Sequence, residues 1–256
     1  MTEASYTSTE LLACVAASLL EDRKSVFVGT GLPMIAAMLA QRTHAPGLLI
    51  IFEAGGIGPQ IPLLPISVGE SRTFYKAVGA SSMHDVMSAS QAGYLDYGFL
   101  GAAQLDRFGN INTTVIGPHD APIARLPGSG GANDVGSFCH RTIIIMRQDR
   151  RKFAERVDFI TTPGYLTGPG ARERAGLPAN TGPYRVITQL GVYGFDDTTR
   201  EIYLIAVHPG VTVEEIQANS GFPIPVSAQL TTSPAPTAEQ RRILQEIDPA
   251  GLLIAH

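Results

Sequence analysis

Two short apolar runs that do not alternate with polar residues constrain the fold of this chain more than any other feature. They are SVFVG (25–29) and GLLIIFE (47–53), and the helical pattern PMIAAMLAQR (33–42) stands between them with a proline in its first turn. Strands without alternation are buried on both faces, as in a parallel sheet covered by helices. The sequence therefore predicts an α/β fold with an open, mostly parallel sheet flanked by helices.

The rest of the chain continues this alternation of helices and strands. Thr7 and Glu10 have the spacing of a capping box and predict a helix over 8–22. Further helices are predicted at 84–93, 212–221 and 237–248, and residues 151–160 are predicted as a helix followed by the entry to a strand. Further strands are predicted at 97–106, 107–117, 141–147 and 183–189, and as a hairpin over 192–209 that turns at 196–199. Glycine-rich loops are predicted at 126–137 and 161–183.

Length and composition favour a single globular domain and exclude several functional classes. The chain has 256 residues without a repeat or a low-complexity linker, so we expect one domain over 1–256. Its net charge is −4 and no long basic cluster occurs, which argues against nucleic acid. The spacing of cysteines and histidines predicts neither a disulfide framework nor a metal site. A polar, acidic start and the lack of a long apolar run predict a cytoplasmic protein without a membrane segment.

Glu53 stands at the end of an apolar strand, and Gly55 and Gly56 follow it closely. In parallel α/β sheets, ligands bind beyond the carboxyl ends of the strands, which is where this side chain is expected. An ionised glutamate is a nucleophile that needs no separate base. The two glycines are expected to leave room for a bulky substrate. On the pattern alone, a solvent-exposed glutamate or one that caps a neighbouring helix is an equal alternative.

A second glycine-rich stretch, GSGGAND (128–134), is the other candidate for a binding element. Glycines allow main-chain N–H groups to converge on an oxyanion or a phosphate, although a flexible surface loop would have the same composition. The stretch is not a Walker loop, because no Lys-Ser/Thr pair follows it. VGTGLP (28–33) does not complete a dinucleotide fingerprint, since Met34 stands at the third glycine position, and Gly29 and Gly31 fit a tight strand-to-helix turn.

Several of these stretches occur together and in order along the chain. They are IIFEAGG (50–56), GAAQLDRFGNINTT (101–114), PGSGGAND (127–134) and TTPGYLTGPGARERAGLP (161–178). Their joint occurrence resembles the B subunit of family I CoA-transferases, and within that family the glutaconate group. The resemblance extends over essentially the whole chain and implies an open α/β fold of the NagB-like type.

The resemblance also implies a reaction and a set of site residues. The nucleophile of the family is a glutamate in an E-x-G context, and Glu53 falls on it. Its carboxylate attacks an acyl-CoA thioester to give an acyl-glutamyl anhydride, and the returning CoA thiolate gives a glutamyl-CoA thioester from which a second carboxylic acid takes CoA, in a ping-pong sequence. CoA is a substrate, and no metal or redox cofactor is implied. The residues implied to contact substrate or CoA are Gly29, Gly55, Gly56, Gly130, Gly131, Ala132 and Asn133, those of the 128–134 stretch through backbone groups.

The resemblance further implies an A subunit as partner, in an A2B2 or larger assembly. Ala54 stands where the glutaconate enzymes typically carry serine, so the pocket shape and the two acids stay open. Relatives on this scaffold include a decarboxylase with cysteine at the Glu53 position and a ring-opening hydrolase without this glutamate, so Glu53 favours CoA transfer. An acyl-CoA hydrolase or a carbon–carbon lyase is the alternative. A metabolite sensor would require a DNA-binding segment or an effector domain, and the sequence shows neither.

Overall fold

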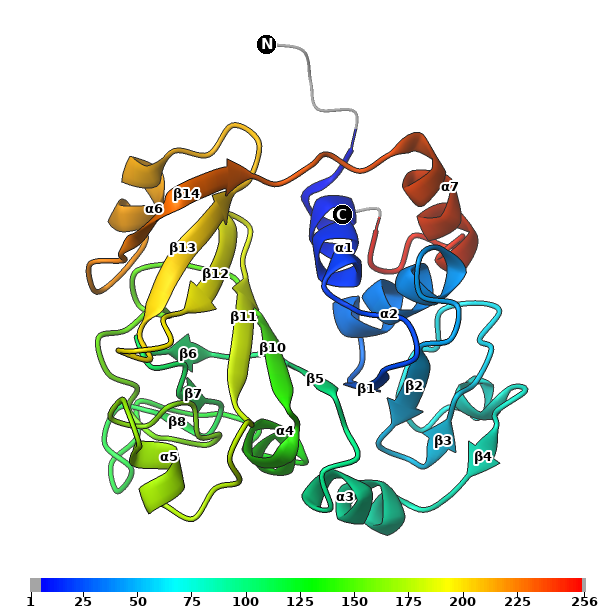
Figure 1. Cartoon of the computed structure of the whole chain (residues 1–256), viewed down its shortest axis with the longest axis horizontal. Helices are drawn as coiled ribbons and strands as arrows, with labels where there is room; N and C mark the ends of the chain where they lie inside the picture. Colours follow the sequence, from blue (N-terminus) through cyan, green and yellow to red (C-terminus); the bar gives the residue numbers. More distant parts are fainter. Residues whose placement is uncertain (1–5, 255–256) are drawn as a thin grey trace. The chain divides into compact units, whose positions relative to one another are not determined.

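The structure is a computed structural model that describes residues 6–254. The chain forms two compact units (Figure 1). Unit 1 comprises the residues up to 89, residues 94–99 and those from 234 onward, and unit 2 comprises residues 90–93 and 100–233. The single CoA-transferase domain expected over 1–256 stays a prediction, and each unit is described by itself.

Unit 1 is built on parallel strands that are buried on both faces. β1 lies between β2 and β5 and runs parallel to both, with Val28 of β1 opposite Phe52 of β2. All residues of β1 are buried, so the burial expected from its unbroken apolar sequence is confirmed. Antiparallel pairing occurs beyond β2. The strands, in spatial order, are β5 (Tyr97–Leu100), β1 (Ser25–Val28), β2 (Leu49–Phe52), β3 (Gly56–Ile57) and β4 (Gly79–Ala80).

Helices α1, α2 and α7 pack together beside these strands (Figure 1). The predicted capping box starts α1: the Thr7 N–H donates to Glu10 Oε2 at 2.7 Å, and the Glu10 N–H donates to Thr7 Oγ1 at 3.1 Å. Pro33 stands in the first turn of α2, as expected. The helical elements of this part of the chain are α1 (Ser8–Ser18), α2 (Leu32–Arg42), the 3₁₀ helix η1 (Ser71–Phe74), α3 (Met83–Gln91) and α7 (Ala238–Ile247).

Unit 2 contains a mixed set of strands. β10 and β11 pair in parallel, as do β13 and β14, whereas β12 is antiparallel to both of its neighbours. The predicted hairpin between β12 and β13 is confirmed, and its turn is closed by Asp196 Oδ1, which accepts from the N–H groups of Thr198 and Thr199 at 2.8 Å each. The strands, in spatial order, are β14 (Val226–Thr232), β13 (Ile202–Val207), β12 (Gly191–Phe195), β11 (Pro183–Ile187) and β10 (Arg141–Ile145).

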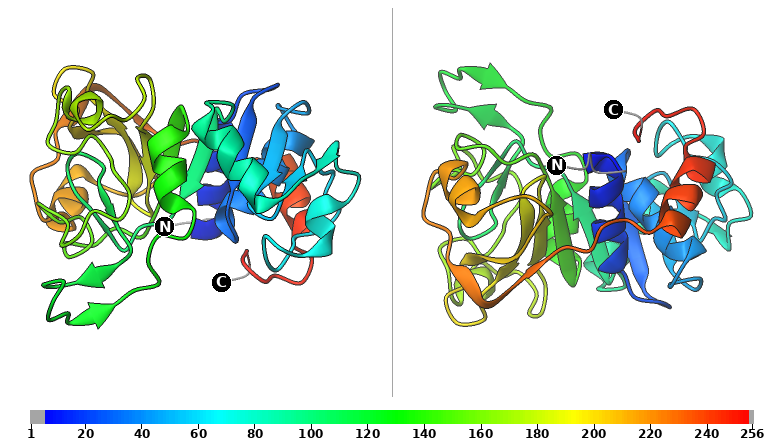
Figure 2. Two further views of the ribbon diagram at one scale, coloured as in Figure 1. Left: turned by 90° about the horizontal axis from the view of Figure 1, so that it is seen from below. Right: turned by 90° about the horizontal axis from the view of Figure 1, so that it is seen from above.

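Short strands and helices complete unit 2. Figure 2 shows β8 and β9 extending from the body of this unit as a two-stranded arm. The short strands are β6 (Gln104–Leu105), β7 (Ile111–Asn112), β8 (Val115–Ile116) and β9 (Ala124–Arg125), and the helices are α4 (Ala132–Phe138), α5 (Ala171–Arg174) and α6 (Val213–Ala218). The α/β class and the open, largely parallel sheet flanked by helices are thus confirmed, with antiparallel strands confined to particular positions.

Some local predictions were wrong. Residues 151–160 do not form a helix, and residues 152–154 pair with β6 instead: the Leu105 N–H donates to the Lys152 oxygen at 2.7 Å, and the Ala154 N–H donates to the Leu105 oxygen at 3.0 Å. The loop predicted over 126–137 ends early, because α4 begins at Ala132. Strand β14 was not predicted. Among the described residues, no helix is both long and apolar enough to cross a bilayer, and no group of three His, Cys, Asp or Glu side chains is arranged to hold a metal ion.

A buried histidine in unit 2 makes its stability dependent on pH. His208 is 2% exposed, and its Nε2 lies 2.8 Å from the Thr188 oxygen while its Nδ1 lies 3.0 Å from Ser233 Oγ. Burial lowers the pKa of His208 below its usual 6.5. The contribution of neutral His208 to the stability of unit 2 is therefore fully present above about pH 6.5. It is lost as the pH decreases through the folded-state pKa, because the unfolded chain binds the proton more readily.

We expect the urea midpoint of unfolding to decrease when the pH is lowered from about 7 to about 5. In the His208→Gln variant, the midpoint should change less with pH. The exposed His140 gives a matched control, His140→Gln, which should retain the wild-type dependence. Equal pH slopes for wild type and His208→Gln in urea titrations would contradict the assignment.

Candidate active site

Glu53 lies at the tip of the turn that joins β2 to β3. The Gly55 N–H donates to the Phe52 oxygen at 2.9 Å, so Glu53 and Ala54 occupy the two central positions of a tight turn. The side chain of Glu53 is half-buried. Glu53 was expected as the last residue of the strand, and the structure places it one residue beyond β2, at the carboxyl end where α/β sheets bind ligands.

Gly29 lies next to this turn. Because Val28 of β1 is opposite Phe52 of β2, the residues that follow them, Gly29 and Glu53, leave the same edge of the parallel strands. A β-carbon added at Gly29 would meet nothing within 4 Å. The structure therefore brings Gly29 and Glu53 together, with open space beside Gly29.

Gly55 and Gly56 are required by backbone packing, and the expectation that they leave room for a substrate stays a prediction. Gly55 has a φ of +111°, and a β-carbon there would lie 1.9 Å from the Ser81 oxygen. At Gly56 an added β-carbon would lie 2.1 Å from the Thr73 oxygen. These glycines let the 73–82 segment approach the β2–β3 turn closely, and that approach fixes the backbone that carries Glu53.

The GSGGAND stretch lies in unit 2 as a loop that leads into α4. The loop is hydrogen-bonded to the residue that follows β7: the Gly128 N–H donates to the Thr113 oxygen at 2.8 Å. Ser129 organises the next turn: its carbonyl accepts from the Ala132 N–H at 3.0 Å, and its Oγ accepts from the Asn133 N–H at 3.1 Å. The backbone donors of Ala132 and Asn133 are thus engaged within the turn.

The side chain of Asn133 also anchors the loop, because its Nδ2 donates to the Thr161 oxygen at 3.0 Å. Gly130 is exposed, has a φ of +50°, and a β-carbon there would meet nothing within 4 Å, while Gly131 is the N-cap residue of α4. The structure therefore groups Gly130, Gly131, Ala132 and Asn133 in unit 2, and groups Gly29, Glu53, Gly55 and Gly56 in unit 1.

Arg172, which the sequence did not single out, holds the C-terminal end of α4. The side chain is 3% exposed, and burial lowers the pKa of its guanidinium. A cation at the carboxyl end of a helix also interacts favourably with the helix dipole. Its two terminal nitrogens donate to the oxygens of Pro163 at 3.0 Å, Gly164 at 2.8 Å, Gly136 at 3.2 Å and Ser137 at 3.1 Å, and to Thr181 Oγ1 at 2.8 Å.

Comparison with known proteins identifies the family. The family model for coenzyme A transferase matches residues 10–219. The B subunit of the 3-oxoadipate CoA-transferase of Pseudomonas knackmussii is 37% identical over 244 residues, which cover 95% of this chain and 94% of that protein. The chain belongs to the coenzyme A transferase family.

Further similarities extend over nearly the whole chain. The B subunit of the glutaconate CoA-transferase of Acidaminococcus fermentans is 36% identical, over 97% of this chain and 95% of that protein. The crystal structure of that glutaconate coenzyme A-transferase matches with a TM-score of 0.93 over 98% of both chains. The structure of the decarboxylase AibA/AibB also matches, with a TM-score of 0.83, 26% identity and 97% coverage of each chain.

Proposed function

We propose that this chain is the B subunit of a heteromeric CoA-transferase that moves CoA between carboxylic acids, with Glu53 as the nucleophile. The observation that carries the proposal is the position of Glu53: a half-buried carboxylate on a tight turn at the carboxyl end of β2. The chain is similar to the B subunits of two CoA-transferases over nearly its full length, and this similarity supports CoA transfer.

In the proposed reaction, a carboxylate oxygen of Glu53 attacks the thioester carbon of acyl-CoA. The carbon–sulfur bond breaks, CoA leaves as the thiolate, and an acyl-glutamyl anhydride remains. The thiolate then attacks the glutamyl carbonyl of the anhydride, which releases the acyl group as a carboxylate and leaves CoA as a thioester on Glu53. A second carboxylate repeats these steps in reverse, takes CoA and regenerates Glu53. No oxidant or reductant is needed for the balance.

The rigid turn is suited to this role. A nucleophile that changes between carboxylate, anhydride and thioester has to return to one position, and the glycine-dependent contact of the turn with the 73–82 segment restricts its backbone. We assign Gly29, Gly55 and Gly56 to the surroundings of the acyl group. We assign the loop Gly130–Asn133 to CoA or oxyanion contacts, with the N–H groups of Gly130 and Gly131 as the donors, because those of Ala132 and Asn133 donate to Ser129.

We further propose an A subunit as the partner and acyl-CoA and carboxylic acids as substrates, without a metal or redox cofactor. The names of the relatives support this proposal: two of them are B subunits, of a 3-oxoadipate and of a glutaconate CoA-transferase. An A2B2 or larger assembly, a ping-pong order and a cytoplasmic location belong to the same proposal.

A covalent trap tests the proposal directly. The complex with its native partner is incubated with a panel of acyl-CoA thioesters in the absence of an acceptor acid, and peptides are mapped by mass spectrometry. We expect CoA bound as a thioester to Glu53, or the alcohol that borohydride leaves at that side chain. Turnover of an acyl-CoA without any adduct at Glu53 would contradict transfer.

The second candidate is an acyl-CoA hydrolase or a carbon–carbon lyase on the same scaffold. The similarity to the decarboxylase AibA/AibB favours this candidate, because its fold matches over almost the entire chain. The requirement for an acceptor acid separates the two: a transferase turns over only when a second carboxylate is present.

A further inference from the structure

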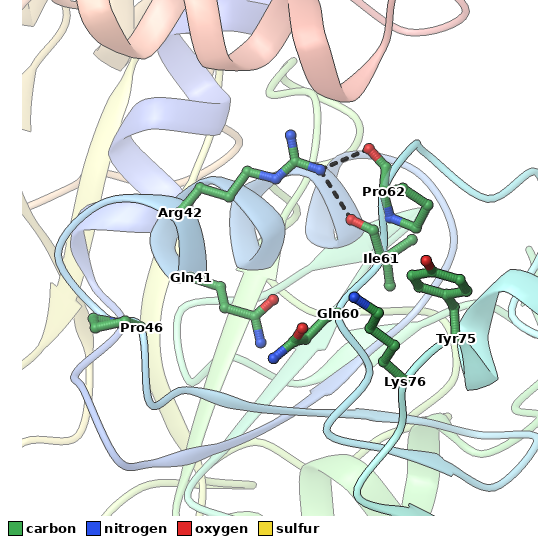
Figure 3. A pocket seen from close by; sticks show the side chains of 8 residues that line it. All are labelled: Gln41, Arg42, Pro46, Gln60, Ile61, Pro62, Tyr75 and Lys76. Atoms are coloured by element: carbon green, nitrogen blue, oxygen red, sulfur yellow. Dashed lines mark hydrogen bonds between the residues drawn. The ribbon is translucent and has the colours of Figure 1, made fainter.

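A pocket of about 470 Å³ lies at the amino end of β2 in unit 1 (Figure 3). Gln41 reaches it from the last turn of α2, and its Nε2 donates to the Leu48 oxygen at 3.2 Å, directly before β2. Gln60 reaches it from the other side, because β3 runs antiparallel to β2 and returns the chain to this end. Glu53 follows the opposite end of the four-residue strand β2, about 13 Å away along its axis.

The pocket carries positive charge in a chain whose net charge is −4. None of the described residues that line it is an Asp or Glu, and its cations are Arg42 and Lys76. Arg42 is already engaged: its Nη2 donates to the carbonyl oxygens of residues 61–62 at 2.9 and 2.7 Å, and the Glu246 carboxylate attracts it. Lys76 is exposed and forms no ion pair within residues 6–254, so its ammonium is the charge that remains for a ligand.

Neutral polar groups surround this ammonium. Figure 3 shows the side chains of Gln41, Gln60 and Lys76 directed toward one another, with Tyr75 beside Lys76. The Lys76 Nζ lies 5.6 Å from the centroid of the Tyr75 ring. Carboxamides both donate and accept hydrogen bonds, so they recognise neutral polar groups next to a charge. Lysine acts as a compact point charge that binds phosphate or carboxylate oxygens.

The backbone at Lys76 has an unusual conformation. Lys76 has a φ of +50°, in the left-handed region that residues with a side chain rarely adopt. The volume of the pocket lies within the range of small-molecule sites, about 300–1,000 Å³.

We propose that this pocket is a second ligand site of the chain, which binds a small metabolite through an anionic group, phosphate or carboxylate, against the Lys76 ammonium. The carboxamides of Gln41 and Gln60 bind the neutral polar part of the ligand. The site is separate from Glu53 because it lies at the amino end of β2, whereas Glu53 follows the carboxyl end, where sheets of this kind bind their ligands. The proposal goes beyond CoA transfer and does not depend on it.

Lysine acetylation measured by mass spectrometry tests this site with internal controls, because Lys24, Lys76 and Lys152 are the lysines of the chain. Lys24 pairs with Asp96 at 2.9 Å and Lys152 pairs with Asp149 at 3.1 Å, both outside the pocket. The full chain and its complex with the partner subunit are acetylated in sodium chloride of constant ionic strength. Inorganic phosphate is added in one series and propionate in the other, which distinguishes the two sources of the anion.

We expect one of the anions to slow acetylation of Lys76 saturably, by about tenfold at roughly ten times its Kd, while the rates at Lys24 and Lys152 stay constant. Gln60→Ala, at an exposed position, should weaken this protection without changing the acetylation of Lys76 in the absence of the anion. Equal slowing at all three lysines, or no slowing by either anion, would overturn the proposal. Protection of Lys76 in the complex without any anion would also overturn it, because the partner would then cover the pocket.

Discussion

Glu53→Gln is expected to lower the rate of CoA transfer by at least about 10³-fold, because an amide is a poor nucleophile and forms neither the anhydride nor the thioester. The substitution keeps the size of the side chain, and Glu53 is half-buried at a turn whose closing hydrogen bond uses backbone atoms of Phe52 and Gly55. The fold should therefore survive. The measurement is the initial rate of CoA exchange between an acyl-CoA and an acceptor acid, with the purified complex.

Glu239→Gln is the matched control for Glu53→Gln. Glu239 is exposed in the first turn of α7, so the same chemical change there removes a charge from the same unit without touching the turn. Its exchange rate should equal that of the wild type. A folded Glu53→Gln complex that exchanges CoA at the normal rate would refute the role of Glu53 as the nucleophile.

Arg172→Met is expected to destabilise unit 2 by about 3 kcal/mol or more, because five oxygens lose their donor together and four of these hydrogen bonds are buried. Methionine retains much of the apolar stem, so the loss reflects the hydrogen bonds rather than a cavity. In a chain of this size that change lowers Tm by roughly 6–12 °C. Thermal unfolding followed by circular dichroism measures it.

Arg174→Met provides the comparison on the same short helix. Arg174 is exposed, and its Nη2 donates at 3.3 Å to the Pro169 oxygen at the surface. Removing this side chain should leave Tm nearly unchanged. If Arg172→Met and Arg174→Met shift Tm equally, the buried hydrogen bonds of Arg172 do not hold the end of α4.

The sequence predicted those features of the site that depend on short segments of the chain. The apolar run before Glu53 identified a buried strand, and a carboxylate after such a strand has to emerge at its carboxyl end. The register of β1 and β2 then brought Gly29 beside it. The Gly-rich stretch was recognised by composition, but composition did not reveal that α4 begins at Ala132 or that Ser129 engages two of the backbone donors.

The part that could not be predicted depends on groups far apart in the sequence. Residues 151–160 have a helical pattern, yet Leu105 offers their backbone a different set of hydrogen bonds. Arg172 and Arg174 are alike in sequence, and only the carbonyl oxygens that surround Arg172 distinguish them. The pocket at Lys76 depends on the return of the chain after β3 to the end of α2.

The sequence by itself determined the α/β class, the buried parallel strands and the position of Glu53 at a strand end, because hydrophobic periodicity and strand polarity are properties of short segments. Only the tertiary structure decided why Gly55 and Gly56 are glycines. The Ser81 and Thr73 oxygens lie where their side chains would begin, and no short segment contains both partners of such a contact. Distant backbone contacts thus fix the turn on which Glu53 is held.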